Sequence, residues 1–166
     1  PGFRDSDLGA QVVLPALRKF GVRHLDLMLI SHAHADHAGG ARSIWRGLPV
    51  TQVISGEPPD LPDELRALPC TSGKQWEWDG VRFTLWHWPG ATDSNQNSCV
   101  LQIEANGERL LLTGDIDARA ERVLLGSSLA VHSQTDPPPA SIASTIHRLA
   151  TTRSDRRSVS VTRDLG

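Results

Sequence analysis

Hydrophobic residues follow two patterns in the first part of the chain, and each predicts its own kind of element. The segment 25–30 is short and, apart from one Asp, entirely Leu, Ile and Met, which is typical of a strand buried on both faces. Within 5–20 the apolar residues recur at helical spacing, at Val12, Val13, Leu17 and Phe20. Pro15 predicts a kink or a break in that helix, and Ser6 or Asp7 is expected to cap its start.

Alternating apolar and polar residues predict two hairpins later in the chain. The strand pairs are 75–78 with 81–88, and 98–104 with 109–113. Asp79-Gly80 and Asn106-Gly107 separate the strands, and both are strong signals for two-residue turns. The tryptophans on the first hairpin are interpreted as core or as cover for the sheet. A platform on which nucleic-acid bases stack is the alternative.

The remaining segments complete the expected order of elements. Further helices are expected at 41–48 and 118–125, and a short strand at 50–54. Prolines between 57 and 69 predict a loop with at most one helical turn, near 63–65. From Gly126 the chain is rich in Ser, Thr, Arg and Pro, which predicts a poorly ordered tail over 126–166 with at most one short helix at 141–150.

Length and charge limit the classes of protein. A chain of 166 residues predicts one domain. With a net charge of −2 and a pI near 6.4, the chain lacks the excess of positive charge that is typical of nucleic-acid-binding proteins. This counts against a tight DNA-binding module. The charge does not exclude a nuclease whose metal ions bind the phosphates of the DNA. No run approaches the ~20 apolar residues of a membrane span.

The strand at 25–30 ends in a cluster of metal-binding residue types. Positions 32–37 read His-Ala-His-Ala-Asp-His, so four side chains that bind metal fall within six residues. Imidazole nitrogen and carboxylate oxygen suit zinc, manganese or iron. In an extended segment His32 and His34 point the same way. We therefore expect them to bind one ion, with Asp36 and His37 reaching a second.

A second apolar strand ends in an acidic residue. Leu110, Leu111 and Leu112 lead into Gly114 and Asp115. Strands that end side by side present their exit residues at one edge of a sheet. Asp115 is therefore predicted to bridge the two ions, with a simple turn residue as the alternative. Asp117 is interpreted as the start of the following helix.

These motifs resemble a known family. Residues 30–40, which hold the histidine cluster, resemble the signature of the metallo-β-lactamase fold. Residues 111–117 and 98–101 resemble, more narrowly, the hydrolase-like domain of the ComEC/Rec2 family of DNA-uptake channels. The resemblance runs from Pro1 to about Leu125. It implies an α/β (α+β) fold, a partial αββα sandwich over residues 1–125.

The resemblance also implies a function. It implies a hydrolase with two divalent ions, Zn or Mn, that lower the pKa of a shared water, and with Asp36 and Asp115 as catalytic residues. DNA is the implied substrate, a membrane channel domain the implied partner, and the outer (periplasmic) side of a bacterial inner membrane the implied location. The alternatives are a hydrolase of a small ester, thioester or lactam, and a remnant that only binds metal.

The chain departs from the family's pattern in three places. The loop 93–97 lacks the histidine that proteins of this fold usually carry there, so Asn95 or Asn97 is expected to contact substrate or a metal-bound water. Residues 129–133 do not match the family's His-His-Gly-Ser stretch. The family's opening strands would precede Pro1. The chain is therefore expected to be a fragment that lacks the N-terminal strands and the C-terminal histidine-containing part of the sandwich.

Two further features have more than one interpretation. His87 is interpreted as a packed strand residue, with metal ligation as the alternative. Cys70 and Cys99 do not form a metal-type pair. The oxidising compartment that the resemblance implies permits a disulfide between them. The residues alone leave both the free and the paired state open.

Overall fold

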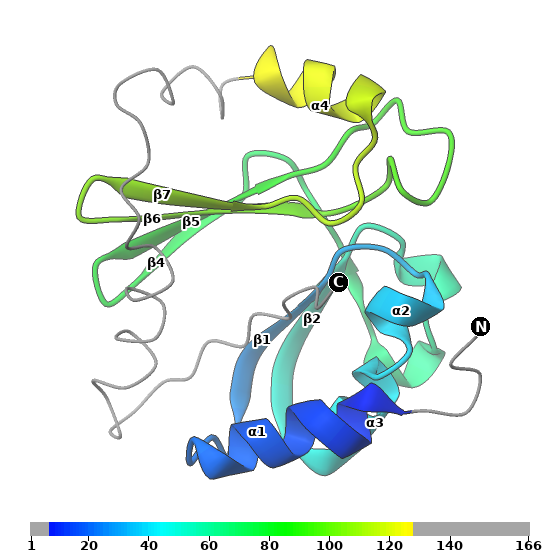
Figure 1. Ribbon diagram of the computed structural model, residues 1–166, viewed down its shortest axis with the longest axis vertical. Coiled ribbons are helices and arrows are strands. Elements are labelled where there is room, and N and C mark those ends of the chain that lie inside the picture. Colours follow the sequence, from blue (N-terminus) through cyan, green and yellow to red (C-terminus); the bar gives the residue numbers. More distant parts are fainter. Residues whose placement is uncertain (1–6, 128–166) are drawn as a thin grey trace.

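Two β-sheets face each other with helices on their outer sides (Figure 1). The computed structural model describes residues 7–127. The parallel sheet has the order β1 (Leu25–Ile30), β2 (Val50–Ser55) and β3 (Leu68–Pro69). The antiparallel sheet has the order β4 (Gln75–Trp78), β5 (Val81–Trp86), β6 (Val100–Ala105) and β7 (Glu108–Leu112). The α/β sandwich predicted from the sequence is confirmed. The predicted tail lies almost wholly outside the described residues, and the predicted helix at 141–150 lies entirely outside them.

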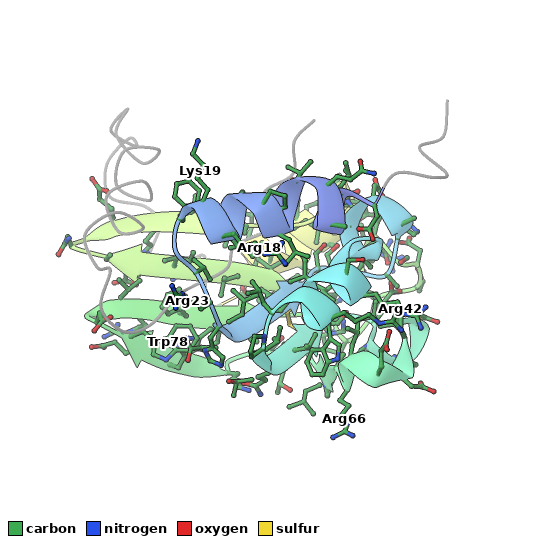
Figure 2. The ribbon with its side chains drawn as sticks, turned by 90° about the horizontal axis from the view of Figure 1, so that it is seen from below. Arg18, Lys19, Arg23, Arg42, Arg66 and Trp78 are labelled. Atoms are coloured by element: carbon green, nitrogen blue, oxygen red, sulfur yellow. A yellow bond between two sulfur atoms is a disulfide. The ribbon has the colours of Figure 1, made fainter. Side chains whose placement is uncertain are left out.

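The outer side of the parallel sheet is covered by the first helices. They are η1 (Gly9–Val13), α1 (Leu14–Lys19) and α3 (Ala41–Gly47), while the short α2 (Ala35–Ala38) follows β1. Leu14 and Ile44 pack on Met28 and Val53 beneath them, and all four are buried. Arg18, Lys19 and Arg42 are exposed on this side of the molecule (Figure 2).

The first helix differs in detail from the one predicted over 5–20. Its first part, η1, is π-helical, and the α-helix begins only at Leu14, with Pro15 in its first turn. The break considered at Pro15 does not occur, since residues 8–19 are helical throughout. The hydrogen-bond pattern changes from π to α just before Pro15, which has no N–H to donate to the preceding turns. The Ala10 N–H donates to Oδ1 of Asp7 at 2.9 Å, so Asp7 caps the helix as expected.

The two sheets pack through a second apolar cluster. Leu27 and Ile54 of the parallel sheet meet Phe83 and Leu85 of the antiparallel sheet, all buried. Trp76 stacks on Phe83 with ring centroids 5.3 Å apart. Trp76 is partly buried against this cluster, so the interpretation of the first-hairpin tryptophans as core or cover for the sheet is confirmed for Trp76.

Both predicted turns are present. Asp79 and Gly80 have φ of 51° and 79°, and Asn106 and Gly107 have φ of 54° and 80°. Positive φ at both central residues defines the tight turn that matches the twist of the flanking strands. On the outer side of this sheet lies α4 (Ala118–Leu125), as predicted, with Leu124 packed on Trp86 and Val100.

The segment between β2 and β3 contains more regular structure than predicted. Two 3₁₀ turns are present, η2 (Pro58–Asp60) and η3 (Asp63–Leu65), where at most one was expected. The prolines that predicted a loop also favour the first positions of a helical turn, because their φ is already fixed there. Leu65, only 1% exposed, anchors the second turn in the core.

A disulfide links the two sheets. Cys70, just after β3, is bonded to Cys99, just before β6. This resolves the alternative left open by the sequence. None of the helices within residues 7–127 is long and apolar enough to cross a membrane.

Candidate metal centre

The predicted ligands meet at one end of the sandwich. His32 lies two residues after β1 and is fully buried, and Asp36 and His37 lie on α2. Asp115 lies three residues after β7. The metal turn, residues 31–37, therefore faces the exit of β7. A carboxylate oxygen of Asp115 and ring nitrogens of His32 and His37 lie within 4.8 Å of one another.

The other two predicted ligands lie beside this cluster, so the donor atoms form two close pairs. His34 Nδ1 lies 3.0 Å from His32 Nε2. His37 Nε2 lies 3.1 Å from Asp115 Oδ2, and 3.8 Å from Oδ2 of Asp36. The Asp36 side chain is 78% exposed and His34 is also exposed, so these two lie at the open margin of the site.

These spacings fit a divalent ion. Two ligands bound at about 2.1 Å to a tetrahedral ion lie about 3.4 Å apart. The 3.0 Å pair of His32 with His34 and the 3.1 Å pair of His37 with Asp115 are close to that value. Imidazole nitrogen and carboxylate oxygen are also the donors that Zn²⁺ and Mn²⁺ accept. The residues present therefore fit the metals that the sequence predicted.

Two serines orient the imidazoles, and sequence reasoning missed both. Ser31 Oγ lies 3.1 Å from Nδ1 of His32 and 3.2 Å from Nδ1 of His37. Ser98 Oγ lies 3.3 Å from the same His32 atom and accepts the Asp115 N–H at 3.2 Å. With each Nδ1 held by a hydroxyl, Nε2 faces the other predicted ligands. Metal-binding histidines commonly use one nitrogen for a polar partner and the other for the ion.

Burial keeps His32 in its metal-binding form. Burial lowers the pKa of His32, and the neighbouring His37 and His34 lower it further. Asp115 and Glu57 act in the opposite direction but do not cancel this. The His32 imidazole is therefore neutral near pH 7, and the neutral ring is the form with a lone pair for a cation.

Two glycines permit the close approach of the segments that build the site. Gly114 has φ of +58°, and a Cβ there would lie 2.7 Å from Cβ of Ser31 and 2.9 Å from Oγ of Ser98. At Gly56 a Cβ would lie 1.8 Å from the carbonyl oxygen of Asn97. Larger residues at these positions would push apart the elements that hold the ligands.

Glu57 is a further residue beside the site that was not predicted from the sequence. It is only 9% exposed, and its carboxylate accepts the Ala33 N–H at 2.9 Å, the Ser94 hydroxyl and the Asn97 side-chain amide at 3.2 Å. Burial raises the pKa of Glu57, but the hydrogen bonds from Ser94, Ala33 and Asn97 outweigh it and hold the pKa below its usual value. Glu57 is therefore ionised near neutral pH. A lone Glu in a proline-rich loop carries no pattern that predicts this.

The remaining candidates lie outside the cluster. His87 is half-buried just after β5, and among the described residues its buried Nε2 has no hydrogen-bond partner. Asp117 accepts the N–H groups of Arg119 and Ala120 and so caps α4, as predicted. The Ala120 N–H and the Gln96 side chain are the main reasons why the pKa of Asp117 is low. The Asn97 amide contacts Glu57.

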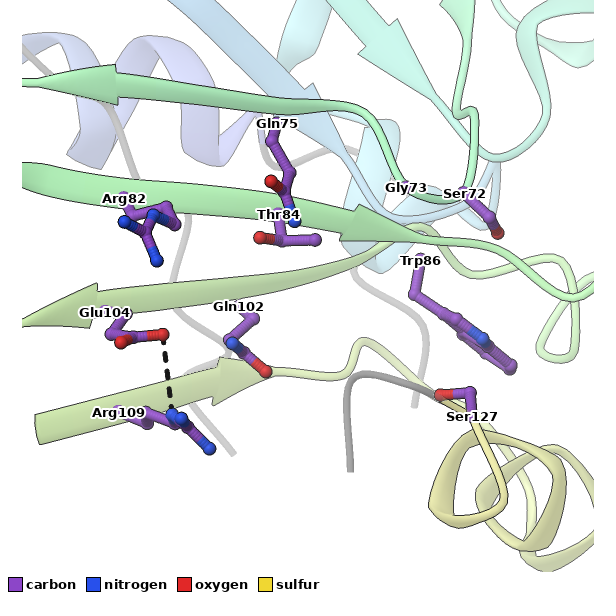
Figure 3. A pocket seen from close by; sticks show the side chains of 10 residues that line it. All are labelled: Ser72, Gly73, Gln75, Arg82, Thr84, Trp86, Gln102, Glu104, Arg109 and Ser127. Carbon is purple, nitrogen blue, oxygen red and sulfur yellow. Dashed lines mark ion pairs between the residues drawn. The ribbon is translucent and has the colours of Figure 1, made fainter. Parts of the chain in front are cut away.

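A separate hollow of about 500 Å³ opens on the outer face of the antiparallel sheet (Figure 3). It is lined by polar side chains and Trp86. Arg109 Nε lies 3.5 Å from Oε2 of Glu104, its neighbour on the adjacent strand (Figure 3). No predicted metal ligand lines this hollow, so it is distinct from the metal centre.

Comparison with known proteins agrees with the fold. Residues 3–161 match the metallo-beta-lactamase superfamily, and the chain belongs to that superfamily. Within it, the chain is a domain related to the ComEC family of competence proteins. The match to the superfamily continues beyond Leu125.

Three relatives document this relationship. The chain is 36% identical over 117 residues (69% of the chain) to competence protein ComA of Neisseria gonorrhoeae. It is 30% identical over 123 residues (73%) to recombination protein 2 of Haemophilus influenzae. It is 35% identical over 127 residues (73%) to the uncharacterized protein YcaI of Escherichia coli. The matched region spans only 15–16% of the length of these relatives.

Proposed function

We propose that this chain is a metal-dependent hydrolase domain that cleaves DNA phosphodiesters. His32 and His34 would hold one divalent ion, Zn or Mn, and Asp36 and His37 would hold a second. Asp115 would supply a carboxylate to both. The observation that carries the proposal is the convergence of His32, His37 and Asp115, from two distant parts of the chain, within 4.8 Å.

The chemistry follows from this set of donors. When bound, divalent ions lower the pKa of a coordinated water and stabilise negative charge on a phosphoryl oxygen. The chain supplies fixed ligands for them: Ser31 and Ser98 hold the imidazoles, and the Ser98 hydroxyl accepts the Asp115 N–H at 3.2 Å. Asp36 and His34, both exposed, lie at the open margin of the site, on the side from which a substrate would reach the ions.

The names of two relatives that match about 70% of the chain support DNA as the substrate. One is named a competence protein and another a recombination protein, and both names concern the handling of DNA. We infer that this domain acts on a DNA strand beside the membrane channel domain of its parent protein, on the periplasmic side of the inner membrane. The Cys70–Cys99 disulfide fits an oxidising compartment of that kind.

A cleavage assay tests the proposal. The chain is incubated with end-labelled single- or double-stranded DNA, or with a p-nitrophenyl ester, in Mn²⁺, Zn²⁺ or EDTA. DNA cleavage is expected with metal only, and His34→Ala should abolish it. His24→Ala is the matched control, because Nε2 of His24 lies 2.7 Å from Oγ1 of Thr51, and His24 is not a predicted ligand. Ester cleavage with intact DNA would establish the small-substrate alternative, and metal binding without either activity would establish a metal-binding remnant.

A further inference from the structure

Glu57 is a buried carboxylate that contacts two separate segments beside the metal centre. Its three hydrogen-bond donors are neutral groups from two separate segments, the Ala33 N–H of the metal turn and the side chains of Ser94 and Asn97. A buried charge is tolerated when hydrogen bonds of this kind replace water. Glu57 is itself fixed, because its N–H donates at 3.1 Å to Ser55 Oγ, at the fully buried end of β2.

The segments it joins are those that carry the ligands. Ala33 lies between His32 and His34, so a bond to its N–H fixes the backbone between two predicted ligands. Asn97 precedes Ser98, whose hydroxyl lies against His32 and accepts the Asp115 N–H. One carboxylate therefore ties the backbone of the metal turn to the segment that supports Asp115.

We propose that Glu57 is a positioning residue that pre-organises the metal turn, so that His32 and His34 are held at chelating distance before any ion binds. The inference rests on the metal centre of the proposed function. It adds a residue that holds the predicted ligands of that centre in place. Glu57 acts through Ala33, Ser94 and Asn97, and its own carboxylate is not among the clustered donor atoms.

Glu57→Gln is the sharpest test, because it keeps the size of the side chain and exchanges one acceptor oxygen for a donor. All three partners are donors. The variant keeps only one acceptor oxygen and loses the negative charge, so the charge-assisted hydrogen bonds that hold the metal turn should weaken. Loss of such supporting contacts typically weakens metal binding 10- to 100-fold. The matched control is Glu64→Gln, because Glu64 accepts from Arg42 and Arg46 on the surface rather than from the metal turn.

The measurement is the Zn²⁺ dissociation constant, obtained by competition with a chromophoric chelator in the absence of substrate. Glu57→Gln should bind Zn²⁺ about 10- to 100-fold more weakly than the wild type, while Glu64→Gln should match it. Hydrogen exchange of the Ala33 amide, without metal, should be slow in the wild type and fast in Glu57→Gln. Wild-type affinity and slow exchange in Glu57→Gln would overturn the proposal.

A second variant keeps the test decisive if Glu57→Gln does not fold. Ser94→Ala removes one donor and leaves the carboxylate with two. It should raise the dissociation constant for Zn²⁺ several-fold, and an unchanged constant would overturn the proposal. Because no substrate is involved, these results depend on the metal centre and not on the activity proposed for it. A wild type that binds Zn²⁺ but leaves DNA intact would refute DNA cleavage and leave the role of Glu57 standing.

Discussion

Nε2 of His37 lies 3.1 Å from Oδ2 of Asp115, although 78 residues separate them in the chain. His37 follows a parallel strand and Asp115 follows an antiparallel one, so the contact joins the two sheets at one end of the sandwich. The fold thus converts two local sequence motifs into one site. The predictions below test what holds this site together.

Ser31→Ala should weaken metal binding without unfolding the protein. The Ser31 hydroxyl is within 3.2 Å of Nδ1 on both His32 and His37, so its loss frees two rings at once. We expect a 10- to 100-fold rise in the Zn²⁺ dissociation constant, measured by chelator competition. Ser127→Ala is the control, because that hydroxyl donates to the Leu124 carbonyl at the end of α4. Equal affinities in both variants would contradict the role given to Ser31.

Gly114→Ala should be more harmful than Gly107→Ala. Both glycines have positive φ, which costs an alanine roughly 1–2 kcal/mol. A Cβ at Gly107 meets open space, whereas one at Gly114 collides with Ser31 and Ser98. Urea unfolding should show a larger loss of stability for Gly114→Ala, and only this variant should also lose metal affinity. Similar losses in the two variants would show that the segments are not packed as described.

Local elements with special backbone requirements were the most predictable part of the fold. Asp79-Gly80 and Asn106-Gly107 predicted their turns correctly, because few other residue pairs adopt positive φ twice in succession. The strand at 25–30 was predictable for another reason. Its residues are nearly all apolar, and the run is too short for a typical buried helix.

Features that depend on contacts between distant residues were not predictable. Glu57 lies 24 residues from Ala33 and 40 from Asn97, and no spacing in the sequence connects them. Ser98 lies 66 residues from His32, and only the fold brings its hydroxyl to that ring. Ser31 adjoins His32 in the sequence, but its contact with His37 is also seen only in the fold. The chemistry of the histidine cluster was predictable because its members lie close together in the sequence. The hydrogen bonds that hold these side chains in place could be identified only from the folded structure.

Removal of the disulfide should lower stability substantially. Cys70 and Cys99 are separated by 29 residues, and closing a loop of that length restricts the unfolded chain by about 3–4 kcal/mol in a chain-entropy estimate. Cys70→Ser with Cys99→Ser should therefore unfold at lower urea. Dithiothreitol should shift the wild type in the same direction and leave the double variant unchanged. A wild type insensitive to reduction would contradict the assigned pairing.

Asp7→Ala should destabilise the protein at neutral pH and much less in acid. The Ser43 hydroxyl and then the Ala10 N–H lower the pKa of Asp7 in the folded state. A lowered pKa contributes stability that is fully present above the unfolded value, about 3.9, and is lost as the pH falls through the folded value. The difference in urea midpoint between wild type and Asp7→Ala should therefore shrink below about pH 4. A constant difference would show that the Asp7 charge is not involved.

The most direct test of the metal centre is a titration of the protein with Zn²⁺, followed through the imidazole ¹H–¹⁵N signals. The signals of His32, His34 and His37 should shift together and saturate, because these rings supply the donor atoms. The signals of His24 and His87, which lie outside the cluster, should not move. If all histidine signals of the folded protein stay unchanged at saturating Zn²⁺, the metal centre does not exist.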